Sequence, residues 1–153
     1  MKMKVFKSIP LEKIKNLNKI ADTLPSYMKT VEITSIQNSQ TINLVVPEQS
    51  DKLDKFIGLR NRKHKKETYT LDDDSVIISE KIASLLKIKV GDTITIKNTD
   101  DIEKDVKVGA ITENYIYHYM YMSSNLYNKL YRENSFKPNT LLIKEAEGTT
   151  EDD

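Results

Sequence analysis

Tyrosine occupies every second position in one short segment of this chain. The four residues are Tyr115, Tyr117, Tyr119 and Tyr121. Successive side chains of an extended strand point to opposite faces, so these rings would share one face. The residues on the opposite face would be Ile116, His118, Met120 and Met122. The segment therefore predicts a strand with one aromatic face, which requires a sheet for it to join.

Two interpretations of the tyrosine segment stay open. A tyrosine ring is apolar but its hydroxyl needs a partner or water, which suits either a half-buried sheet or a contact surface. In the first interpretation the rings pack within the sheet. In the second, Asn114 to His118 form an irregular, partly exposed link whose aromatic side chains meet a partner. The contact residues would then be Tyr115, Tyr117, His118, Tyr119 and Tyr121.

The composition limits the classes of protein that this chain can belong to. Its 153 residues suit one core, or two small lobes that share one. The 24 basic and 23 acidic residues leave a net charge of +1, too little to attract nucleic acid or an acidic membrane globally. The lack of cysteine excludes disulfides and thiol nucleophiles. No apolar run approaches the roughly 20 residues that span a bilayer, so we expect a cytoplasmic protein or a soluble piece of a larger one.

The first half of the chain predicts a mixture of helices and strands. Apolar residues at helical spacing indicate an amphipathic helix that ends before Pro25: Leu11, Ile14, Leu17, Ile20, Ala21 and Leu24. Strands are expected over residues 30–36 and 41–46, joined as a hairpin. Ser50 would cap a short helix, and residues 68–71 resemble a strand.

The second half has the pattern of strands with helices between them. A strand at 76–78 leads into a helix capped by Ser79, a hairpin follows at 93–96 and 106–112, and Ser123 or Ser124 caps another helix before a last strand at 140–144. Within 106–112, one face should carry Val106, Val108, Ala110 and Thr112. The fold class is therefore α+β, with a mixed β-sheet, three or four short helices, and a small β-rich lobe around Thr93 to Thr112.

The expected domain covers residues 1–144, with lobes at 1–87 and 88–144 as a further division. Residues 145–153 are acidic and contain almost nothing to bury, so they predict a disordered tail.

Several charged and hydroxyl residues have ordinary structural explanations. The basic run Arg60–Lys66 is best interpreted as a solvated hairpin tip, with an anion site as the alternative. Asp72–Asp74 lacks the glycine and distal glutamate of a calcium loop, and no metal site is expected. Ser79 and Ser123 lie where helix caps are needed and lack nucleophile motifs. No catalytic residue and no cofactor is predicted.

Three segments together resemble a known family. They are Val76–Ala83, Ile88–Ile96 and Val108–Ser123, and the most specific part is the run Glu-Asn-Tyr-x-x-His-Tyr-x-Tyr-Met-Ser from Glu113 to Ser123. This pattern is similar to the large extracytoplasmic domain of FtsX-like ABC transporter permeases, the group that includes MacB-type exporters. The resemblance covers residues 44–144.

The resemblance implies a noncatalytic domain inserted between membrane helices on the extracytoplasmic face of a bacterial cell membrane. Its partners would be the transmembrane part of the same permease, a cytoplasmic ABC ATPase acting indirectly, and an accessory protein or a peptide or lipid substrate, but no nucleic acid. The domain would contact substrate or accessory protein and transmit ATP-driven motion. Two alternatives remain: a free cytoplasmic regulatory or nucleic-acid-binding module using residues 60–66, and an enzyme with polar groups converging near Glu113, Asn114 and His118.

Overall fold

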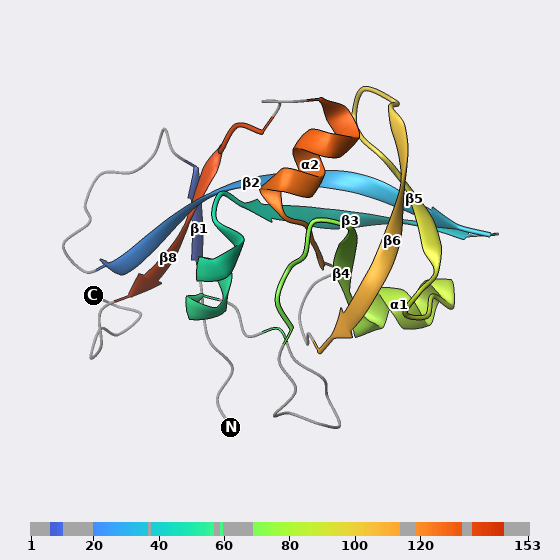
Figure 1. The fold of residues 1–153 in the computed structure, drawn as a ribbon, viewed down its shortest axis with the longest axis horizontal. Coiled ribbons are helices and arrows are strands. Elements are labelled where there is room, and N and C mark those ends of the chain that lie inside the picture. Colours follow the sequence, from blue (N-terminus) through green and yellow to red (C-terminus); the bar gives the residue numbers. More distant parts are fainter. Residues whose placement is uncertain are drawn as a thin grey trace.

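The structure, a computed structural model, describes residues 7–10, 20–36, 38–56, 59, 69–113, 119–132 and 136–145. The elements in chain order are β1 (Lys7–Pro10), β2 (Ile20–Ser35), β3 (Asn38–Pro47), the 3-10 helix η2 (Ser50–Lys55), β4 (Ser75–Ser79), α1 (Glu80–Leu86), β5 (Thr93–Lys97), β6 (Glu103–Thr112), β7 (Tyr119–Tyr121), α2 (Ser124–Tyr131) and β8 (Thr140–Glu145). Figure 1 shows their arrangement.

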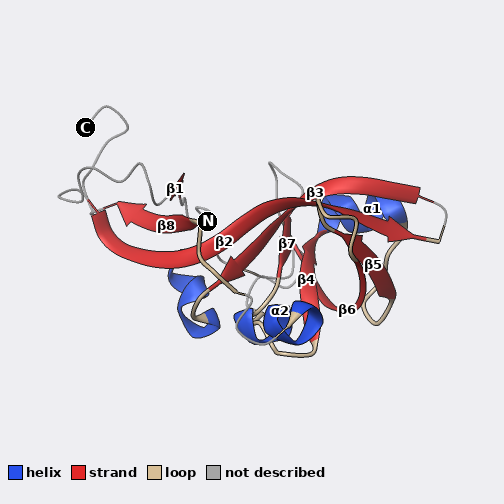
Figure 2. Cartoon of the chain, turned by 90° about the horizontal axis from the view of Figure 1, so that it is seen from above, coloured by secondary structure: helices blue, strands red, loops and turns tan. Residues whose placement is uncertain are grey.

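All the described strands belong to one mixed sheet that closes on itself. The strand order is β1-β8-β2-β3-β7-β4-β6-β5, and β5 also pairs with β2. Six strands therefore form a ring, which is seen as a barrel-like curl in Figure 2. The β3–β7 and β4–β6 pairs are parallel and the others are antiparallel. Outside the ring, β8 continues along the first half of β2 and β1 pairs with β8.

The main hydrophobic core fills the inside of this ring. Every ring strand contributes to it, and its buried strand residues include Val31, Ile33, Ile42, Leu44, Val46, Val76, Ile78, Ile94, Ile96, Val106, Val108 and Met120. Helix α1 adds Ile82, Ala83 and Leu86, and α2 adds Leu126. The alternation of apolar residues along each strand is thus explained by a closed sheet with its apolar side inward.

A second core lies on the outer side of the same strands. Its buried members are Leu24, Val45, Leu53, Phe56, Leu59, Ile77, Ala110, Tyr121 and Leu142. Leu53 and Phe56 come from η2 and the turn after it, and Tyr69 and Leu71 pack against the cluster. Strands β3, β4 and β7 are therefore buried on both faces, which explains the continuous apolar runs in β3 and β4.

Strand β6 changes the face that its side chains occupy. Val108 lies in the ring core, whereas Ala110 lies in the outer core and Ile111 packs against the ring core. The β4 partners of Val108 and Ala110 are consecutive residues, so Gly109 is an extra residue, a β-bulge. The expectation that Ala110 and Thr112 share a face with Val108 is wrong, because one inserted residue reverses every later side chain.

The predicted amphipathic helix up to Leu24 is wrong where it can be checked. Residues 11–19 lie outside the described residues, but Ile20 to Leu24 belong to β2. There Leu24 pairs with Leu142 of β8 and is buried in the outer core. Pairing with a strand more than a hundred residues away overrides the local helical spacing.

Other expectations for the fold are confirmed in part. The mixed sheet is present, and the β2–β3 and β5–β6 hairpins occur as expected. The described residues contain two α-helices and one 3-10 helix in place of the three or four helices expected. Tyr69 to Leu71 are not in a strand; the Tyr69 N–H donates to the Leu59 carbonyl at 2.7 Å, and the segment lies over the outer core.

The β-rich hairpin around Thr93 to Thr112 belongs to the ring and is not a separate lobe, since β5 pairs with β2 and β6 pairs with β4. Strands from both sides of residue 87 therefore share one sheet. Glu145, expected to begin the tail, ends β8, and residues 146–153 lie outside the described part of the chain.

Candidate contact surface

The end of the tyrosine segment is a short strand held on both edges. β7 pairs with β3 in parallel, with Asn43 opposite Tyr119 and Val45 opposite Tyr121. On its other edge β7 runs antiparallel to β4, where Ile77 is opposite Tyr121. The strand expected here is therefore confirmed from Tyr119 to Tyr121.

The two faces of β7 separate aromatic from aliphatic side chains as the alternation predicts. Met120 and Met122 lie in the ring core, while Tyr121 lies in the outer core with Tyr119 packed against it. The rings of Tyr119 and Tyr121 are 5.9 Å apart between centroids, close enough for favourable aromatic contact. Tyr121 is only 1% exposed, so its ring packs within this chain, whereas Tyr119 is half-buried.

The other predicted contact residues fall on an undescribed stretch. Tyr115, Tyr117 and His118 lie outside the described residues, so their role as partner contacts stays a prediction. The structure does describe the residues on either side of this stretch, Glu113 and Tyr119. Glu113, on one side, is 6% exposed, and on the other side the Tyr119 N–H donates to the Ser79 hydroxyl at 3.4 Å. Both flanks are thus held against the ring.

The basic run Arg60–Lys66 also lies outside the described residues. Neither its interpretation as a solvated tip nor its alternative as an anion site is tested. The nucleic-acid-binding alternative depends on this run alone, and it therefore stays a prediction.

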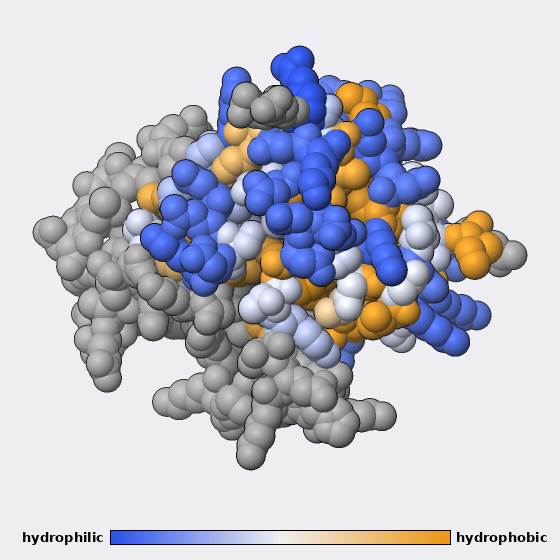
Figure 3. All heavy atoms as spheres, viewed as in Figure 1, coloured by the Kyte–Doolittle hydropathy of each residue, from blue (hydrophilic) through white to orange (hydrophobic). Residues whose placement is uncertain are grey.

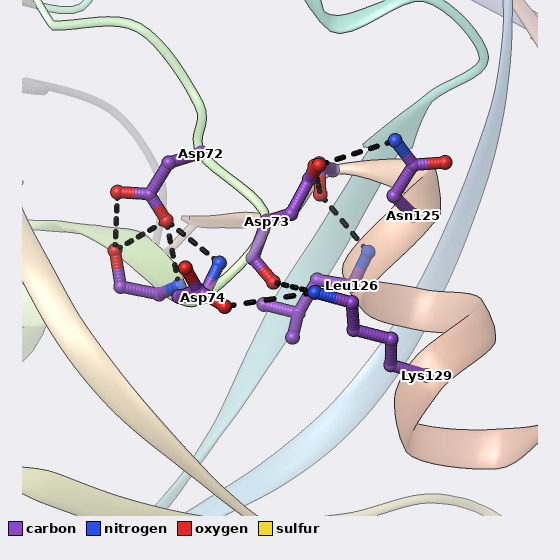
Figure 4. Close-up of polar contacts among 8 residues, drawn as sticks. Asp72, Asp73, Asp74, Asn125, Leu126 and Lys129 are labelled. Atoms are coloured by element: carbon purple, nitrogen blue, oxygen red, sulfur yellow. Dashed lines mark hydrogen bonds and ion pairs between the residues drawn. The ribbon is translucent and has the colours of Figure 1, made fainter.

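The turn before β4 is tied to the start of α2 by consecutive aspartates, as Figure 4 shows. Asp73 accepts hydrogen bonds from the Ser123 hydroxyl at 2.9 Å and the Asn125 amide at 3.2 Å. The Lys129 ammonium lies 3.6 Å from the Asp74 carboxylate and donates to the Asp73 carbonyl at 3.4 Å. A carboxylate at a helix N-terminus is favoured by the helix dipole, so this junction fixes α2 over the ring.

Asp72 turns back onto its own loop. Its carboxylate accepts the backbone N–H groups of Asp74 and Ser75, each at 2.8 Å, and the Ser75 hydroxyl at 3.0 Å. The Asp74 N–H above all holds the pKa of Asp72 below its ordinary value, although partial burial acts in the opposite direction. The three aspartates therefore serve different partners. Among the described residues, no group of three His, Asp or Glu side chains is placed to hold a metal ion.

The two serines predicted as helix caps behave differently. Ser123 is the N-cap of α2, and its hydroxyl accepts the Leu126 N–H at 3.0 Å while donating to Asp73. Ser79 is the N-cap residue of α1, but its side chain makes no capping hydrogen bond and serves Tyr119 instead. Each hydroxyl is thus engaged in holding elements together.

An aromatic group where α2 meets β2 was not identified from the sequence. Tyr127 lies 5.4 Å from Tyr27, 4.7 Å from Tyr131 and 6.4 Å from Phe136, measured between ring centroids. Burial and the neighbouring phenols raise the pKa of Tyr27 to about 12, and burial raises the pKa of Tyr131 to about 12. Tyr127 and Tyr131 on one helical face were the visible signal, but Tyr27 is a hundred residues away in sequence.

A hollow of about 310 Å³ lies beside the outer core and was also missed. It is lined by Ser50, Asp51, Leu53, Leu59, Tyr69, Thr70 and Leu71. Its apolar lining comes from η2 and from the residues on either side of the basic run, which no sequence periodicity brings together. It is the size of a small-molecule site at the lower end of the usual range.

Within the described ranges, no helix has the length and apolar character that crossing a membrane requires. No protein-family model matches the sequence, and no curated protein shows significant sequence similarity to it.

Solved structures similar to this one include three domains of transporters or permeases. The extracellular domain of the ABC-type transporter YknZ from Gram-positive bacteria has a TM-score of 0.56 and 18% identity, over 90% of this chain and 73% of that chain. The periplasmic region of MacB from Actinobacillus actinomycetemcomitans has a TM-score of 0.55 and 10% identity, over 97% of this chain and 78% of that chain. A domain of a protein described as a permease, from Porphyromonas gingivalis, has a TM-score of 0.51 and 13% identity, over 97% of this chain and 76% of that chain. The resemblance to MacB-type extracytoplasmic domains is confirmed at the level of the fold.

Proposed function

We propose that this chain is a noncatalytic extracytoplasmic domain of an ABC transporter permease. The observation that carries the proposal is the shared fold with three such transporter or permease domains, over 90% or more of the chain. Its partners would be the transmembrane part of the same permease and, through that part, a cytoplasmic ATPase subunit.

The pairing of the first and last strands supports insertion between two membrane helices. β1 and β8 run antiparallel with Lys7 opposite Ile143, so the chain enters and leaves the domain through neighbouring strands. A domain inserted into a membrane protein needs its two connections close together. The β1–β8 pair supplies this arrangement at one end of the molecule (Figures 1 and 2).

Strand β2 supports the transmission of motion. Its first half pairs with β8 beside the chain connections, and its second half pairs with β3 and β5 in the ring. One continuous strand therefore links the part of the domain that membrane helices would move to the part that would meet other molecules.

The contact residues of the proposal are Tyr115, Tyr117, His118 and Tyr119. The flanks of this stretch are held by Glu113 and β7, so partner binding there would act on a segment attached to the ring. The partner is an accessory protein or a peptide or lipid substrate. Tyr121, which is buried, would hold the end of the segment in place.

Cysteine labelling in intact cells tests the location. The chain has no cysteine, so a single introduced thiol is unambiguous within it. We expect Thr41→Cys, at an exposed position on β3, to react with a membrane-impermeant maleimide in intact cells. Val45→Cys, at a position that is 0% exposed, is the control and should react only after denaturation. Labelling of Thr41→Cys only after lysis, with the chain in the soluble fraction, would refute the proposal.

Alanine substitution tests the contact role. Replacing Tyr115 and Tyr117 together in the complete transporter should impair export while the purified chain keeps its thermal stability. Unchanged export with reduced stability would show that the two rings belong to the core instead.

A further inference from the structure

The tip of the β2–β3 hairpin carries an isoleucine in an unusual setting. β2 ends at Ser35 and β3 begins at Asn38, and these two residues are opposite each other, so the connection has two residues. Ile36 is the first of them and is 98% exposed, the largest exposure among the exposed large hydrophobic residues. An apolar side chain so placed contributes nothing to either core.

The backbone at Ile36 is also unfavourable for this residue. Two-residue hairpins need a positive φ at their first position, where glycine, asparagine or aspartate is preferred. Ile36 has a φ of 27°, a conformation that a β-branched residue rarely adopts. The tip therefore carries both backbone strain and an exposed apolar side chain, and a glycine or asparagine at this position would form the same turn without either. Strain retained without structural benefit is the pattern expected of a functional position.

The surroundings of Ile36 indicate the chemistry of what it meets. Residues 33–47 carry no charged side chain, although 31% of the chain is charged. The exposed neighbours of the tip, Thr34, Asn38 and Ser39, are uncharged and polar. An apolar centre with a polar rim is the composition of a protein–protein contact. Anionic membranes and nucleic acids are instead recognised through lysine and arginine, neither of which occurs in residues 33–47 around the tip.

The hairpin also projects from the ring. In Figures 1 and 2 it extends beyond β5 at the end of the molecule opposite β1 and β8. Figure 3 shows hydrophobic atoms protruding at this end. Helix α1 lies at the same end, and its Leu85 is 48% exposed. A protruding tip cannot enclose a small molecule, but it can enter a socket on another protein.

We infer that the β2–β3 tip is a docking site for a different extracytoplasmic protein, with Ile36 as the anchor that enters an apolar socket. This inference rests on the proposed function, which brings the tip into contact with other proteins outside the cell membrane. The site is distinct from the tyrosine segment.

The first experiment measures stability. Ile36→Asn places a residue that tolerates positive φ at the tip, and the thermal midpoint of the purified chain should rise by about 2–4 °C or stay unchanged. A lowered midpoint would show that Ile36 packs within this chain, and would overturn the inference.

The second experiment identifies the partner. A photoreactive phenylalanine analogue replaces the exposed Ser39 in cells that express the gene encoding this chain, with Ile36 intact or as Ile36→Asn. We expect one adduct with the product of another gene, weakened about tenfold or more by Ile36→Asn, as for loss of an anchor residue. The same probe at Lys107, exposed on β6, is the control and should not give this adduct.

The remaining outcomes overturn the inference. These are no adduct, an adduct unaffected by Ile36→Asn, an adduct only with a second copy of this chain, and an adduct only with lipid. Fractionation of the same cells separates this result from the proposed function. A chain found in the soluble cytoplasmic fraction refutes the proposed function, whereas a membrane-bound chain without an Ile36-dependent adduct refutes the docking site alone.

Discussion

Gly109→Ala tests whether the β-bulge in β6 requires a residue without a side chain at position 109. A Cβ atom at Gly109 would lie 2.9 Å from the Ser75 Cβ and still closer to the Ser75 Oγ. Ser75 is 8% exposed, and its hydroxyl donates to the Asp72 carboxylate, whose oxygens lie at 3.0 and 3.1 Å. The serine therefore cannot move aside without losing this hydrogen bond.

The expected destabilisation follows from three contributions. Overpacking of this kind costs about 1–3 kcal/mol, and a lost hydrogen bond costs about 1 kcal/mol more. Replacing glycine by alanine also lowers the conformational entropy of the unfolded chain, which offsets about 0.4–1 kcal/mol of this destabilisation. The net loss is about 1–3 kcal/mol, which lowers the thermal midpoint of a chain of this size by about 2–12 °C.

A double-mutant cycle measured by urea unfolding separates the steric cause from others. Ser75→Gly removes both atoms that would lie within 3.0 Å of the new methyl group, so Gly109→Ala should cost much less in that background. Gly91→Ala is the matched control: it has a φ of 97° and nothing within 4 Å of the built Cβ, so its cost is conformational and should not depend on Ser75. Equal costs of Gly109→Ala in both backgrounds would refute the steric explanation.

Three further predictions concern the polar and aromatic contacts. Ser123→Ala should lower the free energy of unfolding in urea by about 1–2 kcal/mol because the α2 cap is lost, and more than Ser124→Ala; equal effects would contradict this. The difference in unfolding free energy between the wild type and Asp72→Asn should be largest near neutral pH and shrink in acid. The reason is that the pKa of Asp72 is lowered in the folded state, so the stabilisation by its carboxylate is lost as the pH falls through that value. A difference that does not change with pH would contradict this explanation. Tyr27 and Tyr131 should ionise near pH 12 in a tyrosinate absorbance titration. The free energy of unfolding should fall above pH 10, because the tyrosines of the unfolded chain ionise at a lower pH than those of the folded chain. Tyr27→Phe should make this fall with pH shallower, and an unchanged pH dependence would contradict the raised pKa of Tyr27.

The sequence predicts those elements whose signals are local. The hairpin strands of β5 and β6 end at turn residues, and Ser123 precedes the apolar face of α2, so a few neighbouring residues are enough to identify them. The separation of Tyr119 from Met120 across β7 follows from the twofold period of a strand alone. Such features do not depend on where the rest of the chain lies.

The errors arise where distant pairing decides the outcome. Ile20 to Leu24 have apolar spacing compatible with a helix, but β8 supplies a partner strand for them near the other end of the chain. The closure of the ring depends on three residue pairs between β2 and β5, for which the sequence contains no local signal. Gly109 shows that an isolated glycine in a strand can reverse its facing side, and only the register with β4 reveals it.

In the described end of the tyrosine segment, the shared face of Tyr119 and Tyr121 was predictable, but the burial of that face was not. The alternation identified a tyrosine face, but whether that face meets solvent depends on η2 and Leu59, which cover the outer core next to Tyr121. A period of two residues reports that a strand has two faces. It does not report what packs on each of them.

The long β2 strand limits how motion could pass through the proposed domain. Its 16 residues extend about 50 Å, and neighbouring strands pair with its two ends on the same edge. Between those pairings the Asn139 side chain bonds both the N–H and the carbonyl of Met28 at 2.9 Å, while the Asn139 N–H donates to the Ser26 carbonyl. A side chain thus extends the β8 pairing toward the ring. β3 supports the opposite edge from Ser26 onward. If the domain does transmit motion, we expect a tilt of β1 and β8 to pass along β2 to the ring and to the β2–β3 tip.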